Sequence, residues 1–159
     1  MITKLKIANF KSHKYSELTT GALTLLSGIN SSGKSSVLQT LLLLRQSFKK
    51  GRLNSGLDLN SPLCDIGKGI DALYRFANDS EIISFSIGVS KTVNYLFQFN
   101  VKNKYDDTFI PKARIPKLEG RILNLPIFTN NFQYLSAGRL AGLDFYPMDS
   151  YAVEKEKQL

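Results

Sequence analysis

The sequence predicts an α/β fold in which antiparallel strands flank a strand, a glycine-containing loop and a helix. Residues 2–8 alternate polar and apolar side chains from the start of the chain, which is typical of a strand. The apolar run at residues 22–27 is followed at once by G-x-x-x-x-G-K-S at residues 28–35. The next stretch, residues 34–48, contains no Gly or Pro and places apolar side chains at helical spacing.

Composition indicates one globular domain of modest size. The 159 residues are 43% hydrophobic and 21% charged, close to the globular average, and this excludes a disordered or collagen-like chain. A lone cysteine, Cys64, cannot form an internal disulfide, so a cytoplasmic, reducing compartment is expected. No apolar stretch approaches the roughly 18 residues of a membrane span, so no membrane partner is expected.

Positive charge is concentrated at the N-terminal end. Residues 1–60 hold nine Lys or Arg and two acids, whereas residues 61–159 hold twelve and eleven, within a net charge of +8. This excess favours a polyanionic partner, either the phosphates of a nucleotide or DNA. A solvated basic face would give the same count, so charge alone leaves DNA binding open.

The first 50 residues read as a compact β-β-β-loop-helix unit. Residues 2–8 and 14–18 are predicted to form two antiparallel strands. The continuous apolar run at residues 22–27 predicts a central strand buried on both faces. Residues 34–48 are predicted to form a largely buried helix.

Beyond the helix, the pattern is more varied. Residues 51–69 are rich in turn formers and predict a long surface loop. Residues 70–102 predict a short helix, with Ile70, Leu73, Tyr74 and Ala77 on one face, and then a hairpin. The hairpin strands, 83–89 and 93–101, alternate strictly, and their aromatic stripe is interpreted as core packing rather than a base-stacking platform.

Residues 103–159 predict mostly irregular structure. Three prolines between residues 103 and 131 favour loop, with an edge strand near 121–125. A further buried strand is predicted at 132–137. The chain as a whole is interpreted as the N-terminal portion of a larger head domain, divided into 1–50, 51–69, 70–102 and 103–159.

The pattern at residues 28–35 predicts the phosphate-binding loop of a P-loop NTPase fold. Gly28 allows the tight turn, Gly33 lets backbone amides close around a phosphate, and Lys34 reaches the β- and γ-phosphates. Ser35 can offer its hydroxyl to Mg²⁺. The predicted nucleotide-binding set is Gly28, Ile29, Asn30, Ser31, Ser32, Gly33, Lys34, Ser35 and Ser36. The alternative is a Gly- and Ser-rich turn before an ordinary helix.

The residues around this loop resemble a known family. I-A-N-F-K-S-H at residues 7–13 and L-L-S-G-I-N-S-S-G-K-S-S-V-L-Q at residues 25–39 are similar to the head of ABC-type ATPases of the Rad50, SMC, RecF and OLD kind. That resemblance implies ATP and Mg²⁺ as ligands. It also implies that Lys11 and Ser12, in the turn after the first strand, contact the nucleotide. His13 is interpreted as an exposed turn residue.

Two further stretches, residues 65–75 and 134–140, are similar to AAA-type ATPases of antiphage defence systems such as Septu. The sequence departs from these relatives at Gly138, where they tend to carry an acid. L-S-A-G-R at residues 135–139 is not interpreted as an ABC signature, because Pro147 comes too early for the helix that should follow.

Hydrolysis in this class needs a Walker B Asp-Glu pair and a signature loop, and neither is found after Lys34. Catalytic residues are therefore unknown, and the isolated chain is not expected to hydrolyse ATP. The resemblance implies a partner, either a second copy or a C-terminal half or partner ATPase subunit, and coupling to DNA repair or antiviral defence. The alternatives are a truncated, non-hydrolysing assembly fragment and a P-loop kinase or GTPase. One His and one Cys cannot form a zinc site.

Overall fold

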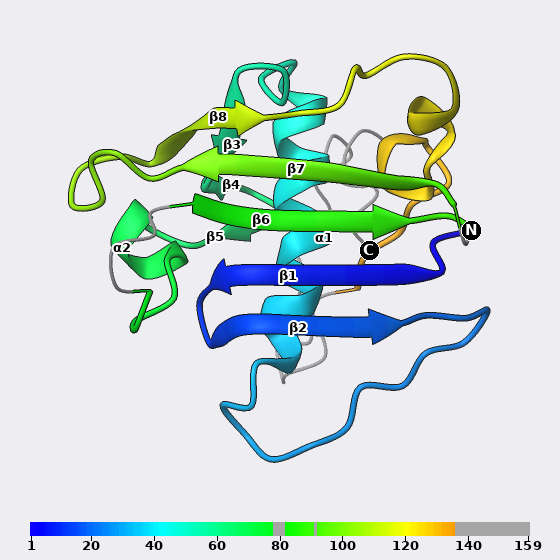
Figure 1. Ribbon diagram of the computed structural model, residues 1–159, viewed down its shortest axis with the longest axis horizontal. Helices are drawn as coiled ribbons and strands as arrows, with labels where there is room; N and C mark the ends of the chain where they lie inside the picture. Colours follow the sequence, from blue (N-terminus) through cyan, green and yellow to red (C-terminus); the bar gives the residue numbers. More distant parts are fainter. Residues whose placement is uncertain (78–81, 91, 136–159) are drawn as a thin grey trace, which may run out of the picture.

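In the computed structural model, which describes residues 1–77, 82–90 and 92–135, a six-stranded antiparallel sheet carries one long helix across one face (Figure 1). The strand order is β2-β1-β6-β7-β8-β3. The larger elements are β1 (Lys4–Phe10), β2 (His13–Thr19), α1 (Lys34–Lys49), β6 (Ile82–Gly88), β7 (Asn94–Asn100) and β8 (Phe109–Arg114). The smaller ones are β3 (Gly56–Asp58), β4 (Asn60–Ser61), β5 (Cys64–Asp65), α2 (Gly69–Ala72) and the 3-10 turns η1 (Gly120–Asn124) and η2 (Pro126–Phe128).

The predicted strands at the start of the chain and the predicted hairpin are confirmed. β1 pairs with β2 on one side and with β6 on the other, and β6 pairs with β7. Their alternation places one set of side chains toward α1, and these are fully or almost fully buried. The set is Leu5, Ile7, Phe85, Ile87, Phe97 and Phe99. The aromatic stripe of the hairpin is therefore core packing, as predicted.

Helix α1 is confirmed and is enclosed on more than its sheet side. It contacts β3, β5 and η2 as well as β1, which explains why its buried residues lie all round the helix. Arg45 is fully buried and donates from Nη1 to the carbonyl oxygens of Ile127 and Thr129, both at 2.8 Å. No helix of the described residues has the length and apolar character to cross a bilayer.

The predicted central strand at residues 22–27 is wrong. The segment forms no strand, and the side chains of Leu23 and Leu25 are 93% and 86% exposed. It follows β2, which lies at the edge of the sheet and pairs with β1 alone among the described strands. An apolar run predicts a preference for burial, but a strand also needs a neighbour to accept and donate its backbone hydrogen bonds.

The predicted surface loop at residues 51–69 is also wrong. This segment contains β3, β4 and β5, and Leu53, Leu57 and Leu59 are at most 1% exposed. β3 pairs with β8, and a Cβ on Gly56 would meet the backbone oxygen of Ile110. The glycine is present because two backbones approach closely, not because the segment is a solvent-exposed turn.

Three smaller expectations need correction. The helix expected over residues 70–77 is confined to α2, and Leu73 instead forms a β-bridge with Phe10. The edge strand expected near 121–125 is the 3-10 turn η1, while β8 holds the strand that was not predicted. Of the strand predicted at 132–137, the described residues 132–135 show only an isolated bridge residue, Tyr134, and Phe132 and Tyr134 pack against the core. Residues 136–137 lie outside the described part of the chain, as does the stretch 138–159.

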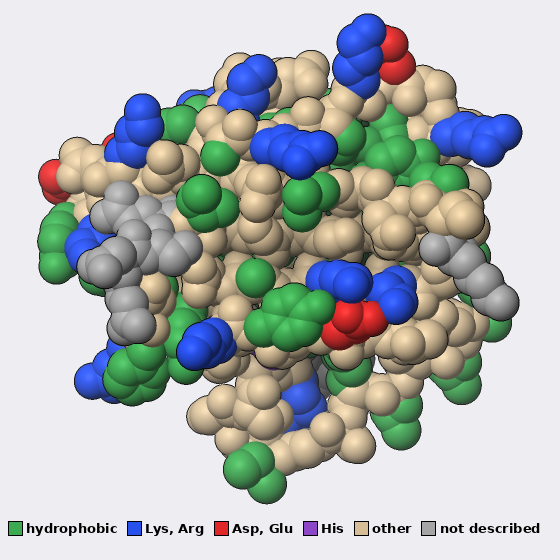
Figure 2. All heavy atoms as spheres, in the orientation of Figure 1, with side chains coloured by type: hydrophobic (Ala, Val, Ile, Leu, Met, Phe, Trp, Pro, Cys, Tyr) green, Lys and Arg blue, Asp and Glu red, His purple; other side chains and the backbone are tan. Residues whose placement is uncertain are grey.

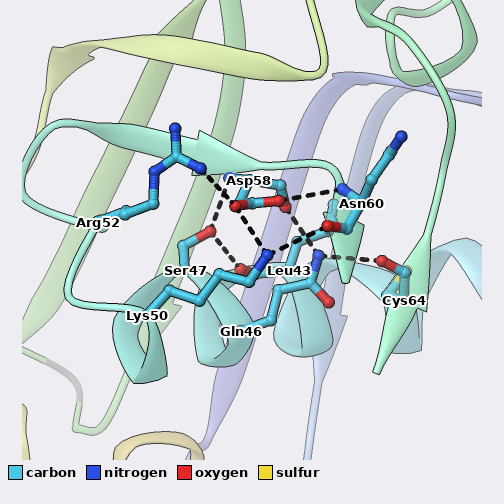
Figure 3. Close-up of polar contacts among 8 residues, drawn as sticks. All are labelled: Leu43, Gln46, Ser47, Lys50, Arg52, Asp58, Asn60 and Cys64. Carbon is cyan, nitrogen blue, oxygen red and sulfur yellow. Dashed lines mark hydrogen bonds and ion pairs between the residues drawn. The ribbon is translucent and has the colours of Figure 1, made fainter. Parts of the chain in front are cut away.

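The segment after α1 is held by a carboxylate, Asp58, whose side chain is 5% exposed (Figure 3). Its Oδ2 lies 3.1 Å from Lys50 Nζ and 3.0 Å from Arg52 Nη1, and its Oδ1 accepts the backbone N–H of Asn60. The Asp58 backbone N–H donates to Ser47 Oγ at 2.8 Å. These contacts join the end of α1 to β3 and β4.

We expect Asp58→Ala to lower the free energy of unfolding by about 1–3 kcal/mol, the usual range for hydrogen bonds to a charged group. The loss stays below that of a fully buried ion pair because Lys50 and Arg52 are 41% and 49% exposed and can regain water. Urea unfolding followed by circular dichroism measures it. Glu119→Ala is the control, because its pair with Lys117 is exposed; equal losses in both variants would contradict this account.

The outer face of the sheet, opposite α1, carries a cluster in which two lysines share one carboxylate (Figure 2). Lys4 and Lys6 lie 2.6 and 3.0 Å from the two carboxylate oxygens of Glu17, whose pKa their hydrogen bonds lower to about 2. Lys50 and Arg52 are likewise paired, and Arg45 is buried. Five of the nine cations of residues 1–60 are therefore either paired with a carboxylate or buried. The positive charge of this segment does not form one open basic face.

Candidate functional site

The loop at residues 28–35 has the backbone shape that its glycines predict. Gly28, Ser31 and Gly33 have φ angles of 148°, 66° and 90°, all on the left-handed side where glycine is favoured. Gly33 is the N-cap of α1 and makes no side-chain cap. The first amides of a helix have no acceptor within the helix, so this end of α1 presents N–H groups and the positive end of the helix dipole.

The side chain of Lys34 folds back along the loop. Its Nζ donates to the carbonyl oxygens of Gly28 at 2.7 Å and Ile29 at 2.6 Å. An ammonium group has three donors, and these two bonds leave the third for an incoming anion. The lysine thus fixes the curvature of the loop and places a cation at its mouth.

A hollow of about 360 Å³ opens at the start of α1. Six of its lining residues belong to the loop and first helical turn: Asn30, Ser31, Gly33, Lys34, Ser35 and Ser36. Lys11 and Ser12, from the β1–β2 turn, complete it. None of these lining residues is acidic, so the hollow combines two cations with amide and hydroxyl donors, which is the chemistry of an anion site.

The structure brings together eight of the eleven predicted binding residues around this hollow. Gly28, Ile29 and Ser32 lie on another side of the loop, where they border a separate hollow of about 530 Å³. Lys11 has a left-handed backbone, with φ of 51°, and its N–H donates to the Ala72 carbonyl at 2.8 Å. That strained turn is held against α2, and it sets Lys11 and Ser12 beside the loop.

A neighbouring hollow of about 460 Å³ shares Lys11 with the first. Its other polar and aromatic lining comes from Asp71, Tyr74, Arg75 and Lys104. Tyr74 is attached to the end of β1 by its backbone N–H, which donates to the Asn9 carbonyl at 3.1 Å. The two hollows together offer a cationic end and an aromatic end on either side of one lysine.

His13 is the residue that the sequence interpretation missed. It is half-buried rather than exposed, and its ring lies between β2 and the loop: Nδ1 is 2.8 Å from Ser16 Oγ and Nε2 is 3.1 Å from the carbonyl oxygen of Gly33. The two residues are 20 positions apart, so no local pattern signals the contact.

Other chemistry is not supported within the described residues. No group of three or more His, Cys, Asp or Glu there could hold a metal ion. Burial raises the pKa of the Cys64 thiol to about 11, so the thiol stays protonated and is a poor nucleophile. Residues 136–140, which carry most of the L-S-A-G-R stretch, lie outside the described part of the chain.

Comparison with known proteins gives one finding. A family model described as an AAA ATPase domain matches residues 1–138 of this chain. No curated protein and no solved structure matches it significantly. The match covers the loop, the β1–β2 turn, the residues that line the three hollows and the whole described sheet.

Proposed function

The chain belongs to the AAA ATPase domain family, and on that premise we propose that it binds ATP with Mg²⁺ at the hollow before α1, as a P-loop NTPase. The observation that carries the proposal is the position of the Lys34 ammonium. Two of its donors are engaged by the loop carbonyls of Gly28 and Ile29, which aims the remaining charge at the hollow. The amides at the start of α1 supply further donors for the β-phosphate.

In this proposal the hollow before α1 and the neighbouring hollow that shares Lys11 bind different parts of the nucleotide. The triphosphate lies over residues 30–36, where the exposed Ser35 hydroxyl can join the coordination shell of Mg²⁺. The base and ribose lie toward Tyr74 and Arg75, with Lys11 at the boundary. A stacking aromatic and a cationic boundary suit a purine nucleoside triphosphate, whereas inorganic phosphate chains would fill only the first hollow.

Nuclear magnetic resonance of the ¹⁵N-labelled chain tests this division. With Mg²⁺ present, ATP is expected to shift the amide signals of residues 30–36 and also those of residues 71–75. Inorganic tripolyphosphate is expected to shift only the first group. Tyr74→Ala should weaken ATP binding by about 5- to 50-fold, in line with the loss of one stacking contact, and leave tripolyphosphate binding unchanged. If ATP shifts amide signals elsewhere but not those of residues 30–36, the proposal is contradicted.

Hydrolysis requires groups beyond this hollow. Its lining holds no carboxylate to coordinate Mg²⁺ through water or to orient an attacking water. In our proposal those groups come from a C-terminal half, a partner ATPase subunit or a second copy of the chain. The complete assembly would couple ATP binding to DNA handling, in repair or in antiphage defence.

A second role, assembly, is favoured by one observation. Leu23, Leu25 and Ile29 are 93%, 86% and 82% exposed in the segment that leads into the loop. Exposed apolar side chains within one segment, whose backbone groups pair with no described strand, suit a further strand beside them. Such a strand would order the loop from the side opposite Lys11, so assembly and ATP binding would reinforce each other.

A further inference from the structure

His13 lies where the β1–β2 turn meets the loop, and it touches both. We infer that His13 is a positioning residue for phosphate binding: its Nε2–H donates to the Gly33 carbonyl and thereby aims the Lys34 amide at the bound phosphate. The inference rests on the proposed ATP site. It gives a role to a residue that lies outside the loop pattern and to which the sequence analysis assigned no contact with the nucleotide.

The hydrogen-bond partners determine which ring nitrogen carries the proton. A carbonyl oxygen can only accept, so the 3.1 Å contact with Gly33 requires a proton on Nε2. In the neutral ring Nδ1 is then an acceptor, and the Ser16 hydroxyl at 2.8 Å donates to it. The Gly33 carbonyl therefore selects the tautomer, and Ser16, whose hydroxyl can donate to Nδ1, holds the ring in place against the loop.

The orientation of the Gly33 carbonyl matters because it fixes the direction of the Lys34 N–H in the same peptide group. The C=O of Gly33 and the N–H of Lys34 lie in one rigid plane and point in opposite directions. Val37 N–H donates to the same oxygen at 3.2 Å, as the first bond of α1. Two donors on that oxygen restrain rotation of the peptide plane and keep the Lys34 N–H directed away from His13.

Close packing supports the same arrangement. A Cβ on residue 33 would lie 2.7 Å from His13 Nε2 and would also meet Ser12 Oγ. The ring thus occupies the space that the glycine leaves, on the side of residue 33 where a side chain would project. His13 borders the hollow of about 530 Å³ and not the phosphate hollow, so it acts through the backbone and not by touching the nucleotide.

A matched pair of amide variants separates positioning from packing. The side-chain nitrogen of Gln reaches as far as His Nε2, whereas that of Asn reaches only as far as Nδ1. We expect His13→Gln to bind Mg-ATP within about 3-fold of the unchanged chain. His13→Asn should bind about 5- to 10-fold more weakly, the effect of one lost hydrogen bond. Both should show similar urea unfolding midpoints, because both lose the same ring.

Hydrogen exchange of the Lys34 amide without nucleotide supplies a second, independent readout. It should be faster in His13→Asn than in His13→Gln, and Ser16→Ala should lie between them. Equal Mg-ATP affinity and equal Lys34 exchange in the two amide variants would overturn the inference. If His13→Asn does not fold, Ser16→Ala against the unchanged chain gives the same comparison. Failure of the unchanged chain to bind Mg-ATP would instead contradict the proposed function.

Discussion

Lys34→Ala is expected to weaken Mg-ATP binding by about 10- to 100-fold, because charge-assisted hydrogen bonds to phosphate are lost along with the cation at the mouth of the loop. The loop also loses its two internal bonds to Gly28 and Ile29, so part of the effect is a less ordered site. Equilibrium dialysis with labelled ATP measures the change, after circular dichroism has established that the variant is folded.

The matched control is Lys14→Ala. Lys14 is an exposed lysine of β2 that lines neither the phosphate hollow nor its neighbour, so its removal changes the net charge equally but not the site. We expect its affinity for Mg-ATP to stay within about 2-fold of the unchanged chain, a small long-range effect of one surface charge. If Lys34→Ala and Lys14→Ala bind equally well, Lys34 does not face the phosphates.

Gly33→Ala is expected to abolish measurable Mg-ATP binding and to destabilise the fold. The left-handed backbone, with φ of 90°, costs an alanine about 1–2 kcal/mol. In addition, the new Cβ would lie 2.7 Å from His13 Nε2 and against Ser12 Oγ, so the turn and the loop must separate. Separation moves Ser12 and rotates the Lys34 peptide, and the anion site loses donors from both sides.

Gly51→Ala separates the cost of placing alanine in a left-handed backbone from the cost of the steric contact at residue 33. Gly51 also has a left-handed backbone, with φ of 67°, but nothing lies within 4 Å of its added Cβ. It follows the far end of α1, away from the hollow. Urea unfolding should show a loss of about 1–2 kcal/mol for Gly51→Ala with unchanged affinity for Mg-ATP. Retained binding in Gly33→Ala would contradict the packing of the turn against the loop.

Local sequence patterns predicted the elements that depend mainly on short-range contacts. The hairpin of β6 and β7 and the helix α1 are each fixed by one period of apolar residues and by short-range hydrogen bonds, and both were predicted within one or two residues. Most residues that line the hollow before α1 lie in or directly after the loop pattern, because they are neighbours in the sequence.

The sequence predictions that were wrong concern segments whose structure depends on partners far away in the sequence. The run at residues 22–27 has the composition of a buried strand, but strand formation depends on a neighbour that the run itself does not specify. The turn formers of residues 51–69 predicted exposure to solvent. Instead, Asp58 is paired with Lys50 and Arg52, which directly follow α1, and the leucines on either side of it pack inward. His13 was misjudged for the same reason, since its partner is Gly33.

Calorimetric titration of the purified 159-residue chain with Mg-ATP decides whether the hollow before α1 binds the nucleotide. We expect saturable binding of one ATP per chain that weakens when Mg²⁺ is withheld and is lost in Gly33→Ala. A folded chain that releases no binding heat over a range of temperatures, or that binds ATP equally well with Gly33→Ala, would contradict this expectation.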